Sequence, residues 1–485
     1  MINNVTIVGG GTAGLTTALI LRAAFPDMKI QLVRSDTIDI VGVGEGTTEH
    51  WRDFLEFVKI NPAEFFLHCG STFKHGIYFK NWNGDGKDYL HNVPTYIIEE
   101  SRIGHPNVLH KLIVENENQM SMFDEFIVQS QHYQPVLEST NQYHFDTFKL
   151  NNFLNDICEK RRINIIVDTI TSVEALGSIK KLHGEKGVYE SDFYIDATGF
   201  AKVVHNKVGS DWKDCTEYLP MNSAITFPTK LDDRFPAYTA ATALSSGWVW
   251  QIPTQERYGN GYVYCDDFIT EDQAIDEVTK YYGHELDIRK KFKFGAGYLR
   301  NVWNKNCLAV GLSASFIEPL EATNIGTAVQ QALAFVNHIG LYDPNSDTVQ
   351  DSYNKKFATV FENTVDFVQL HYFTKRKDSE FWKNSHNIKK TDFNEATLEL
   401  YKKKIPLWTD FVNPYALFNN FNWTMVLTGL ELIDRQSYLD QWEKLPYDTK
   451  TEADVKLDVY YSREAPILGH REAINYIKDT HYAAN

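Results

Sequence analysis

The feature that most constrains the fold of this chain is a glycine-rich segment that directly follows a short apolar run near its start. Residues 4–9 read NVTIVG, which is typical of a strand buried in a parallel sheet. Residues 9–14 read GGGTAG, and residues 12–24 are good helix formers. Glycines in this spacing let the backbone approach a pyrophosphate, and the amides that begin the helix donate hydrogen bonds to it. The motif predicts a dinucleotide site whose cofactor-binding residues are Gly9, Gly11, Thr12, Ala13 and Gly14.

The second strand of this unit is expected over residues 29–33, and it lacks the acidic residue that often closes such a strand. Arg34 takes that place, and Asp36 follows two positions later. Two interpretations stay open: Asp36 reaches the ribose hydroxyls, or Arg34 stacks near the adenine. Both residues are therefore candidates for cofactor binding.

Charge and cysteine content limit the environment in which this chain works. The 48 basic and 64 acidic side chains give a formal net charge of −16, which argues against nucleic acid as a partner. Five widely separated cysteines without a CxxC pair predict neither a disulfide framework nor a metal site. The first strand begins without a basic and apolar leader, and no apolar run approaches the roughly 18 residues that span a bilayer. We therefore expect a cytoplasmic protein that is not associated with a membrane.

Further strand-like runs are spread far along the chain, which indicates an α/β fold interrupted by an inserted layer. They lie at residues 163–167, 193–196 and 307–310. Residues 247–264 alternate aromatic and polar side chains, as the strands of a β-hairpin do.

The last part of the chain is predicted to be mostly helical. Apolar residues recur at spacings of four and three from Phe357 to Tyr372, which is the period of an amphipathic helix. Breaks are expected near Pro406, Pro414 and Pro446. We therefore expect two functional modules: an α/β module over residues 1–345 that contains the dinucleotide site, and a mostly helical lobe over residues 346–485 that binds the substrate.

Two downstream segments resemble flavoproteins of the glutathione-reductase type. Residues 192–200 (DFYIDATGF) resemble the strand that returns to the FAD site, and residues 307–311 (CLAVG) resemble the final strand. Leu312 stands where that strand is usually followed by Asp. The resemblance implies FAD rather than NAD, in an α/β fold of the glutathione-reductase or para-hydroxybenzoate-hydroxylase type with an inserted β-layer and a mostly helical C-terminal substrate lobe. Because we find one dinucleotide fingerprint, a separate NAD(P)H-dependent flavin reductase is expected to supply reduced flavin.

A pair of tryptophans carries the most specific resemblance. Residues 247–253 read GWVWQIP and resemble the GWxWxIP signature of flavin-dependent halogenases. Trp248 and Trp250 alternate along the expected strand, so both side chains point to one face, where they would separate the flavin from the substrate. Other segments resemble the tryptophan halogenases, and the resemblance covers roughly residues 1 to 435. These segments are residues 41–47 (VGVGEGT), 71–74 (STFK), 79–82 (FKNW), 316–326 (FIEPLEATNIG) and 367–382 (FVQLHYFTKRKDSEFW).

The resemblance implies an FADH2-dependent halogenase that uses O2 and a halide ion and forms hypohalous acid at a flavin hydroperoxide. Lys74 matches the family's catalytic lysine, which passes this species to the substrate. Glu321 matches the glutamate that orients the electrophile or takes the proton lost from the ring. The backbone amides of Thr323 and Asn324 match the halide site, although the family usually has Gly in place of Asn324. Further flavin contacts are implied for Gly46, Thr47, Ile170, Leu312 and Ile325.

The departures from the family concern the substrate pocket. A His-Pro-Phe segment that helps to sandwich an indole reads HNV at residues 91–93, so the histidine is kept and the aromatic ring is lost. Ala322 replaces the family's Ser. We therefore expect an electron-rich, indole-like aromatic substrate contacted by His91 and Glu321, and tryptophan itself is less well supported than halogenation. Replacement aromatic surface, or core packing, is expected from Trp408, Phe411, Tyr415 and Trp423.

Two other functions stay open at this point. An FAD-dependent aromatic monooxygenase hydroxylates a substrate placed beside the flavin, and the paired tryptophans and Lys74 argue against that arrangement. A non-catalytic flavoprotein would leave both Lys74 and Glu321 without a role. The family resemblance also implies a homo-oligomer, with a dimer as the expected assembly.

Overall fold

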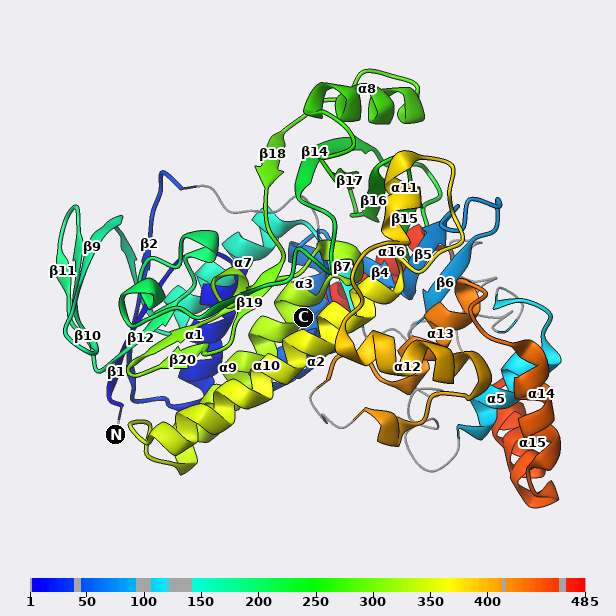
Figure 1. Ribbon diagram of the computed structural model, residues 1–485. Helices are drawn as coiled ribbons and strands as arrows, with labels where there is room; N and C mark the ends of the chain where they lie inside the picture. The colour runs from blue at the N-terminus through cyan, green and yellow to red at the C-terminus, as the bar shows by residue number, and fades with distance from the viewer. Residues whose placement is uncertain are drawn as a thin grey trace. The chain divides into compact units, whose positions relative to one another are not determined.

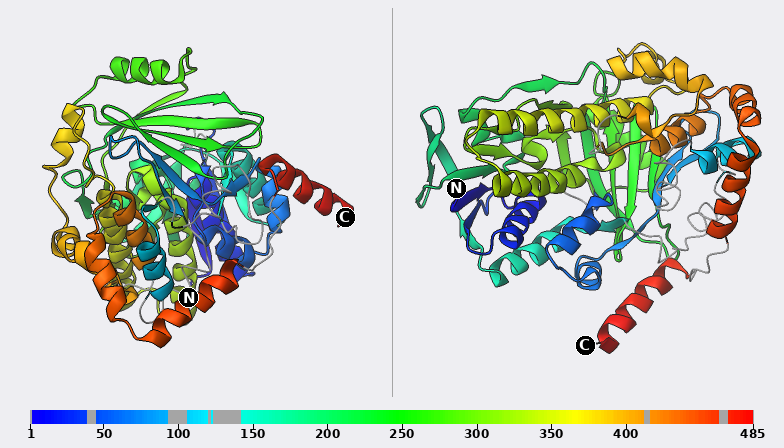
Figure 2. Two further views of the ribbon diagram at one scale, coloured as in Figure 1. Left: turned by 90° about the vertical axis from the view of Figure 1, so that its right-hand side faces the viewer. Right: turned by 90° about the horizontal axis from the view of Figure 1, so that it is seen from below.

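The computed structural model describes residues 2–38, 45–92, 106–119, 122, 142–411, 416–461 and 468–484 (Figures 1 and 2). The chain divides into two compact units, each made of three segments. Unit 1 comprises Met1–Ser71, Phe145–Cys215 and Gly295–Glu362, and unit 2 comprises Thr72–His144, Thr216–Phe294 and Asn363–Asn485. The functional boundary expected after residue 345 stays a prediction.

Unit 1 is built on a six-stranded sheet with the order β20-β21-β12-β1-β2-β8. The strands from β21 to β8 run parallel, and β20 pairs with β21 in the antiparallel sense. Val5, Ile7 and Leu32 are fully buried, as expected of a parallel sheet in a core. The sheet confirms the prediction from the apolar runs. The bounds are β1 Asn4–Val8, β2 Lys29–Arg34, β8 Asn164–Val167, β12 Phe193–Asp196, β20 Trp303–Asn304 and β21 Cys307–Ala309.

Helix α1, Thr12–Ala24, joins β1 to β2 and has the bounds predicted from the sequence. It packs against α7, Thr147–Lys160, and α9, Thr323–Leu341 (Figure 1). Asp146 caps α7 because its carboxylate accepts hydrogen bonds from the first free amides of that helix. The other elements of unit 1 are β3 Glu45–Gly46, α2 His50–Phe57, α3 Pro62–His68, β9 Ile170–Ala175, β10 Ile179–Gly184, β11 Val188–Tyr189, β13 Trp212–Asp214, β19 Gly297–Leu299, β22 Ser315–Phe316 and the short 3-10 helices Gly199–Ala201, His205–Lys207, Gly311–Ser313 and Pro319–Glu321.

Unit 2 contains a seven-stranded sheet with the order β18-β14-β17-β16-β15-β5-β6. Strands β16 and β17 form the hairpin predicted over residues 247–264. Helix α8, Glu271–Tyr282, covers one face of this sheet, where Val249 and Tyr262 pack in one cluster with Val278 (Figure 1). The bounds are β5 Gly76–Lys80, β6 Tyr89–Asn92, β14 Ser223–Lys230, β15 Thr239–Ala243, β16 Gly247–Pro253, β17 Arg257–Tyr264 and β18 Lys290–Lys293. In a small three-stranded sheet of the order β3-β7-β4, β4 Thr72–Lys74 pairs antiparallel with β7 Gln142–Phe145.

The end of the chain is mostly helical, as predicted. Breaks occur near Pro406 and Pro446, whereas Pro414 lies outside the described residues. Tyr372 was expected on the long amphipathic helix, but α10 ends at Leu370. The helices outside the sheets are α5 Asn107–Glu115, α10 Asp347–Leu370, α11 Glu380–Ser385, α12 Asp392–Lys403, α13 Asn420–Gly429, α14 Arg435–Lys444, α15 Tyr447–Tyr461 and α16 His470–Ala484, with a 3-10 turn at Trp408–Asp410.

Two further properties concern membranes and metals. Among the described residues, none of the helices combines the length and apolarity that crossing a bilayer requires. The described residues also contain no group of three or more His, Cys, Asp or Glu side chains arranged to hold a metal ion.

Candidate active site

The carboxyl ends of four parallel strands meet at one edge of the unit 1 sheet. The amide of Gly9 donates to the Val33 carbonyl, and the amide of Ala197 donates to the Val8 carbonyl. The amide of Val310 in turn donates to the Asp196 carbonyl. Segments from across the first 310 residues of the chain therefore lie side by side at this edge, which is where open α/β sheets bind their ligands.

The glycines of the N-terminal motif have two distinct roles. Gly9 has φ +117, and a Cβ there would overlap the carbonyl oxygen of Ala197. A Cβ at Gly14 would overlap the carbonyl oxygen of Gly9. A Cβ at Gly11 would meet no atom within 4 Å, so the backbone at the start of α1 faces open space. This opening, lined by the free amides of a helix N-terminus, fits a dinucleotide pyrophosphate.

Arg34 is the last residue of β2 and Asp36 follows it by two positions, and both are exposed. The Arg34 side chain lies against the glycine loop, since a Cβ at Gly10 would stand 2.7 Å from the Arg34 Cβ. Ile170, at the start of β9, packs against the core cluster that contains Val8 and Val33. These predicted cofactor residues therefore surround the ends of β1 and β2.

Asp196 is a structural residue of this edge for which the sequence suggested no role. One carboxylate oxygen accepts hydrogen bonds from the amide and hydroxyl of Thr198 at 2.9 and 2.7 Å and from the Ser313 hydroxyl at 3.0 Å. The other oxygen accepts from the amides of Val204 and His205, each at 2.8 Å. Asp196 thereby joins the end of β12 to the turn that carries Leu312. The DATG segment made Asp196 recognisable in the sequence. The donors at Val204, His205 and Ser313 could not be identified from that segment.

The segment around β3 contains a carboxylic acid with an altered pKa. Residues 41–44 of the expected flavin loop lie outside the described residues, while Gly46 and Thr47 are buried. Burial raises the pKa of Glu45 to about 7, and a hydrogen bond from the Thr147 hydroxyl at 3.2 Å partly offsets this. Glu45 was not singled out in the sequence, because its ionisation depends on how deeply β3 is buried.

We predict that Glu45→Gln stabilises the apoprotein at neutral and alkaline pH but not at acid pH. The pKa of Glu45 is raised from 4.5 to about 7 in the fold, so the folded chain holds a proton that the unfolded chain loses, and stability falls as the pH rises through this window. The amide of Gln stays neutral and still accepts from Thr147. Thermal unfolding should show equal midpoints for both proteins at about pH 4 and a variant more stable by roughly 1–2 kcal/mol at about pH 8, after allowing for partial exposure. A uniform shift at both pH values would contradict ionisation as the cause.

The segment with the predicted halide site forms the start of α9. Glu321 ends a 3-10 turn and is 4% exposed. Ala322 then adopts a left-handed conformation with φ 55, which redirects the chain so that Thr323 and Asn324 are the first residues of the helix. The first amides of a helix have no partner within it and carry the positive end of its dipole. This geometry can bind an anion, and Asn324 does not prevent it because the unusual φ falls on Ala322.

Ile325 and Leu312 lie beside the same turn. Ile325 is 9% exposed, and Leu312 is half-buried in the 3-10 helix that packs against α9. Gly326 lets α9 approach the residues after β3, because a Cβ there would overlap the Thr48 hydroxyl. The predicted residues at the start of α9 are thus Leu312 and Ile325 for the flavin and Thr323 and Asn324 for the halide.

Lys74 ends β4 in unit 2 and is 3% exposed. Its neighbour His144 is buried, and burial holds the pKa of His144 well below its ordinary value, with the charge of Lys74 as the next cause. The Thr72 hydroxyl donates to the Pro253 carbonyl at 2.7 Å, so at 3.1 Å it accepts from Nδ1 of His144. Nε2 of His144 then accepts from the Thr239 hydroxyl at 2.8 Å. Lys74 therefore lies beside a neutral histidine, on a strand tied to the end of β16.

Trp248 and Trp250 lie on one face of β16, with ring centroids 6.2 Å apart, as expected from their alternation. Val249 between them belongs to the cluster under α8. Gly261 is opposite Trp250 in β17, and a Cβ there would overlap the Trp250 ring. Trp248 is 1% exposed, and its Nε1 has no hydrogen-bond partner within the described part of the chain. Their role in separating flavin from substrate stays a prediction.

His91 lies on β6 and is 2% exposed. Its ring packs 5.3 Å from the ring of Phe367 and 6.3 Å from that of Phe418. The Asn422 amide nitrogen donates to Nε2 of His91 at 3.0 Å, while its oxygen accepts from the Asn419 amide. Val93 and Tyr415 lie outside the described residues, and Phe411 and Trp423 pack on each other.

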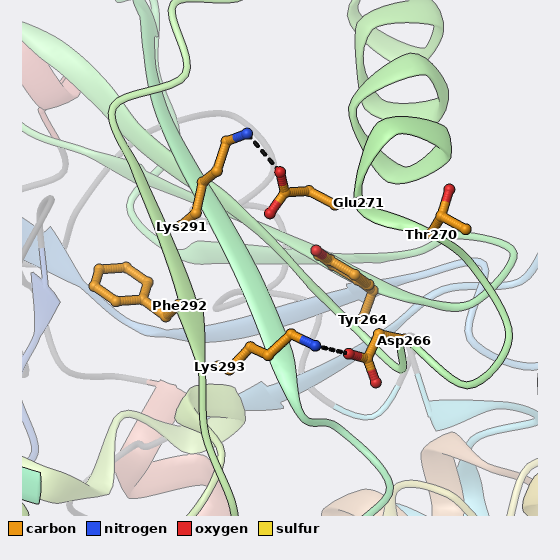
Figure 3. A pocket seen from close by; sticks show the side chains of 7 residues that line it. All are labelled: Tyr264, Asp266, Thr270, Glu271, Lys291, Phe292 and Lys293. Carbon is orange, nitrogen blue, oxygen red and sulfur yellow. Dashed lines mark hydrogen bonds and ion pairs between the residues drawn. The ribbon is translucent and has the colours of Figure 1, made fainter.

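A cavity of about 350 Å³ lies elsewhere in unit 2 (Figure 3). Figure 3 shows two ion pairs in its wall, Lys291–Glu271 at 2.5 Å and Lys293–Asp266 at 2.7 Å. None of the predicted site residues lines it. Because its lysines already have carboxylate partners, this cavity is not assigned to the chemistry.

Comparison with known proteins gives one consistent result. A family model described as tryptophan halogenase matches residues 4–441. The tryptophan 6-halogenase ThaL of Streptomyces albogriseolus is 29% identical over 483 residues, which cover 90% of each chain. The crystal structure of the tryptophan 6-halogenase SttH of Streptomyces toxytricini superposes with a TM-score of 0.84 at 26% identity, covering 98% of this chain and 99% of that one. A flavin-dependent halogenase of Xanthomonas campestris gives a TM-score of 0.82 at 26% identity, with 98% of both chains covered.

Proposed function

The chain belongs to the tryptophan halogenase family and is a flavin-dependent halogenase, and from this premise we propose that Lys74 delivers the halogen to an electron-rich, indole-like aromatic substrate. The family match favours halogenation over the hydroxylation that the sequence alone left open. The observation that carries the proposal is a lysine only 3% exposed, on a strand tied by Thr72 to the strand of the paired tryptophans.

We assign the cofactor to the sheet edge of unit 1. Bound reduced FAD would supply two electrons that activate molecular oxygen, and the oxygen would then oxidise a halide ion to hypohalous acid. The open space at Gly11 and the amides that begin α1 would hold the pyrophosphate. The contact of Arg34 with the glycine loop supports Arg34 as the residue near the adenine, with Asp36 as the alternative ribose contact. Gly46, Thr47, Ile170, Leu312 and Ile325 are proposed to line the rest of the flavin site.

The halide ion is proposed to bind the amides of Thr323 and Asn324 at the start of α9. Lys74 would then hold the electrophile by hydrogen bonding or as a haloamine. Glu321 is proposed to accept the proton that leaves the ring carbon when aromaticity returns. In the balanced reaction, one aromatic C–H, one halide ion, one proton, one O2 and one FADH2 give one C–halogen bond, one FAD and two molecules of water.

The substrate is proposed to be an indole-like aromatic that is not restricted to free tryptophan. The unpartnered Nε1 of Trp248 supports a ligand surface on this face of β16, because a buried N–H normally has an acceptor. Asn422 fixes the orientation of the His91 ring by donating to its Nε2, and we propose that the oriented ring contacts the substrate.

The test is to supply the protein with FAD, a separate NAD(P)H-dependent flavin reductase, oxygen and either chloride or bromide. L-tryptophan, indole, a tryptophan-containing peptide and a phenol would be offered separately, with halide-free reactions as controls. Mass spectrometry should find ring-halogenated products from indole compounds other than tryptophan. Products from tryptophan alone would contradict the proposed substrate class, and hydroxylated products would contradict the proposed role of Lys74.

The reductase is proposed as a separate partner because the sequence contains one dinucleotide fingerprint. We also propose that the protein forms a homo-oligomer and works in the cytoplasm. Gel filtration with light scattering tests the first of them.

A further inference from the structure

The strand that carries Lys74 is bound differently along its two edges. On one edge, β4 pairs with β7. The amides of Phe73 and His75 point to the other edge, because alternate residues of a strand share an edge. There the His75 amide donates to the Ala237 carbonyl at 2.7 Å, whereas the Phe73 amide donates to Nε2 of His470 at 3.0 Å. An imidazole from the C-terminal helix thus takes the place of a backbone acceptor directly beside Lys74.

The hydrogen bonds of His470 determine its tautomer. Because Nε2 accepts from the Phe73 amide, the ring proton is on Nδ1. Nδ1 then donates to the Pro236 carbonyl at 3.1 Å, with the Phe235 carbonyl at 3.3 Å. Burial lowers the pKa of His470 to about 3, so the ring stays neutral at ordinary pH.

Packing fixes the ring in this position. Its centroid lies 4.5 Å from the Phe235 ring and 5.8 Å from the Phe73 ring. The next residue, Arg471, also packs on Phe235, with its guanidinium carbon 5.2 Å from the centroid of that ring. Among the side chains of α16 whose burial is described, the buried ones lie in its first two turns, where His470, Ala473 and Ile474 are 3%, 0% and 7% exposed. The first turn of α16 therefore holds β4 against the segment that precedes β15.

We propose that His470 is a positioning residue for Lys74, which it serves by holding the β4 backbone through the Phe73 amide. This inference rests on the catalytic role proposed for Lys74. Without a neutral acceptor at this position, β4 loses a hydrogen bond one residue before Lys74, and the ammonium or amine shifts relative to the substrate. His470 itself touches neither substrate nor halide in this assignment.

The test compares His470→Gln with His470→Leu in the full-length holoenzyme. Gln offers an oxygen that accepts from Phe73 and an amide that donates to Pro236, whereas Leu has a similar volume and neither group. The readout is halogenated product formed per flavin reoxidised. We expect His470→Leu to lower this ratio on the order of tenfold to a hundredfold, as for small misplacements of catalytic groups, while flavin reoxidation keeps its wild-type rate. His470→Gln should recover at least about half of the ratio.

The controls separate this inference from the role of Lys74. His284→Leu changes an exposed histidine of unit 2 and should leave the ratio unchanged. Lys74→Ala should lose halogenation, and adding His470→Leu to it should have no further effect on the ratio. If Lys74→Ala stays active, the role of Lys74 is wrong. If it is inactive but His470→Leu has the wild-type ratio, or if Gln and Leu are equally impaired, positioning by His470 is wrong. Should His470→Leu fail to fold, a His470→Gln ratio below about a tenth of wild type overturns the proposal, and a recovered ratio supports it.

Discussion

Lys74→Ala is expected to abolish halogenation of every aromatic substrate while leaving flavin reoxidation at its wild-type rate. The side chain is 3% exposed and ends a strand whose backbone pairing with β7 does not depend on it. Removing a positioned group that holds the electrophile should lower product formation by about a thousandfold. The residues assigned to FAD and halide belong to unit 1, whereas Lys74 belongs to unit 2, so oxygen consumption should continue and release hypohalous acid. Stopped-flow absorbance measures reoxidation, and mass spectrometry measures the product.

Lys74→Met and Lys80→Met complete this experiment. Met keeps the length of the lysine side chain and fills the same space, so its inactivity would point to the lost nitrogen and not to a cavity. Lys80 lies six residues along the chain on β5, with its Nζ 5.7 Å from the Tyr78 ring centroid, and Lys80→Met should stay active. Halogenation by either Lys74 variant at more than about a tenth of the wild-type rate, or loss of flavin reoxidation, would contradict the assigned role.

Gly14→Ala is expected to lower the stability of the apoprotein, whereas Gly11→Ala is expected to weaken FAD binding without affecting folding. A methyl group at Gly14 would overlap the Gly9 carbonyl oxygen, which is backbone and cannot move aside cheaply. The apoprotein should therefore lose about 1–3 kcal/mol of stability or more. A methyl group at Gly11 meets no protein atom, and the φ of −77 there suits alanine. Gly11→Ala should fold normally and bind FAD about tenfold to a hundredfold more weakly, since the methyl group occupies the space assigned to the pyrophosphate.

Thermal unfolding of the apoprotein and FAD titration by fluorescence separate the two effects. Gly86 provides a control, because it is exposed and a Cβ there meets nothing within 4 Å. Its φ of 77 means that Gly86→Asn is a better control than Gly86→Ala. If Gly11→Ala binds FAD as tightly as the wild type, the pyrophosphate does not lie at this loop.

The parts of the fold that the sequence predicted are those with a local cause. The strand, glycine turn and helix over residues 4–24 follow from periodicity and from backbone constraints within a few residues. The hairpin at residues 247–264 follows from the alternation of its side chains. Gly261 lies opposite Trp250, and its missing side chain leaves the space that the Trp250 ring fills. The segments around Lys74 and Glu321 were identified by their resemblance to a family and not from their own chemistry.

Other features depended on contacts that no local pattern contains. The end of α10 two residues before Tyr372 and the raised pKa of Glu45 both follow from how neighbouring segments pack. Asp196 stood in a recognisable segment, but its partners at Val204 and Ser313 were not predictable. A buried polar atom needs a partner, but the sequence does not say which of many distant groups supplies it.

The sequence by itself predicted a dinucleotide site after the first strand, and its resemblance to a family predicted the halogenase chemistry that the family match confirms. Only the tertiary structure shows which groups hold the proposed catalytic and substrate residues in place. Asn422 orients His91 from 331 residues away, and His470 holds the strand of Lys74 from 397 residues beyond Phe73. The physical reason is that glycine turns, strands and helices are specified by neighbours in sequence, whereas hydrogen bonds between buried groups are specified only when distant segments pack together.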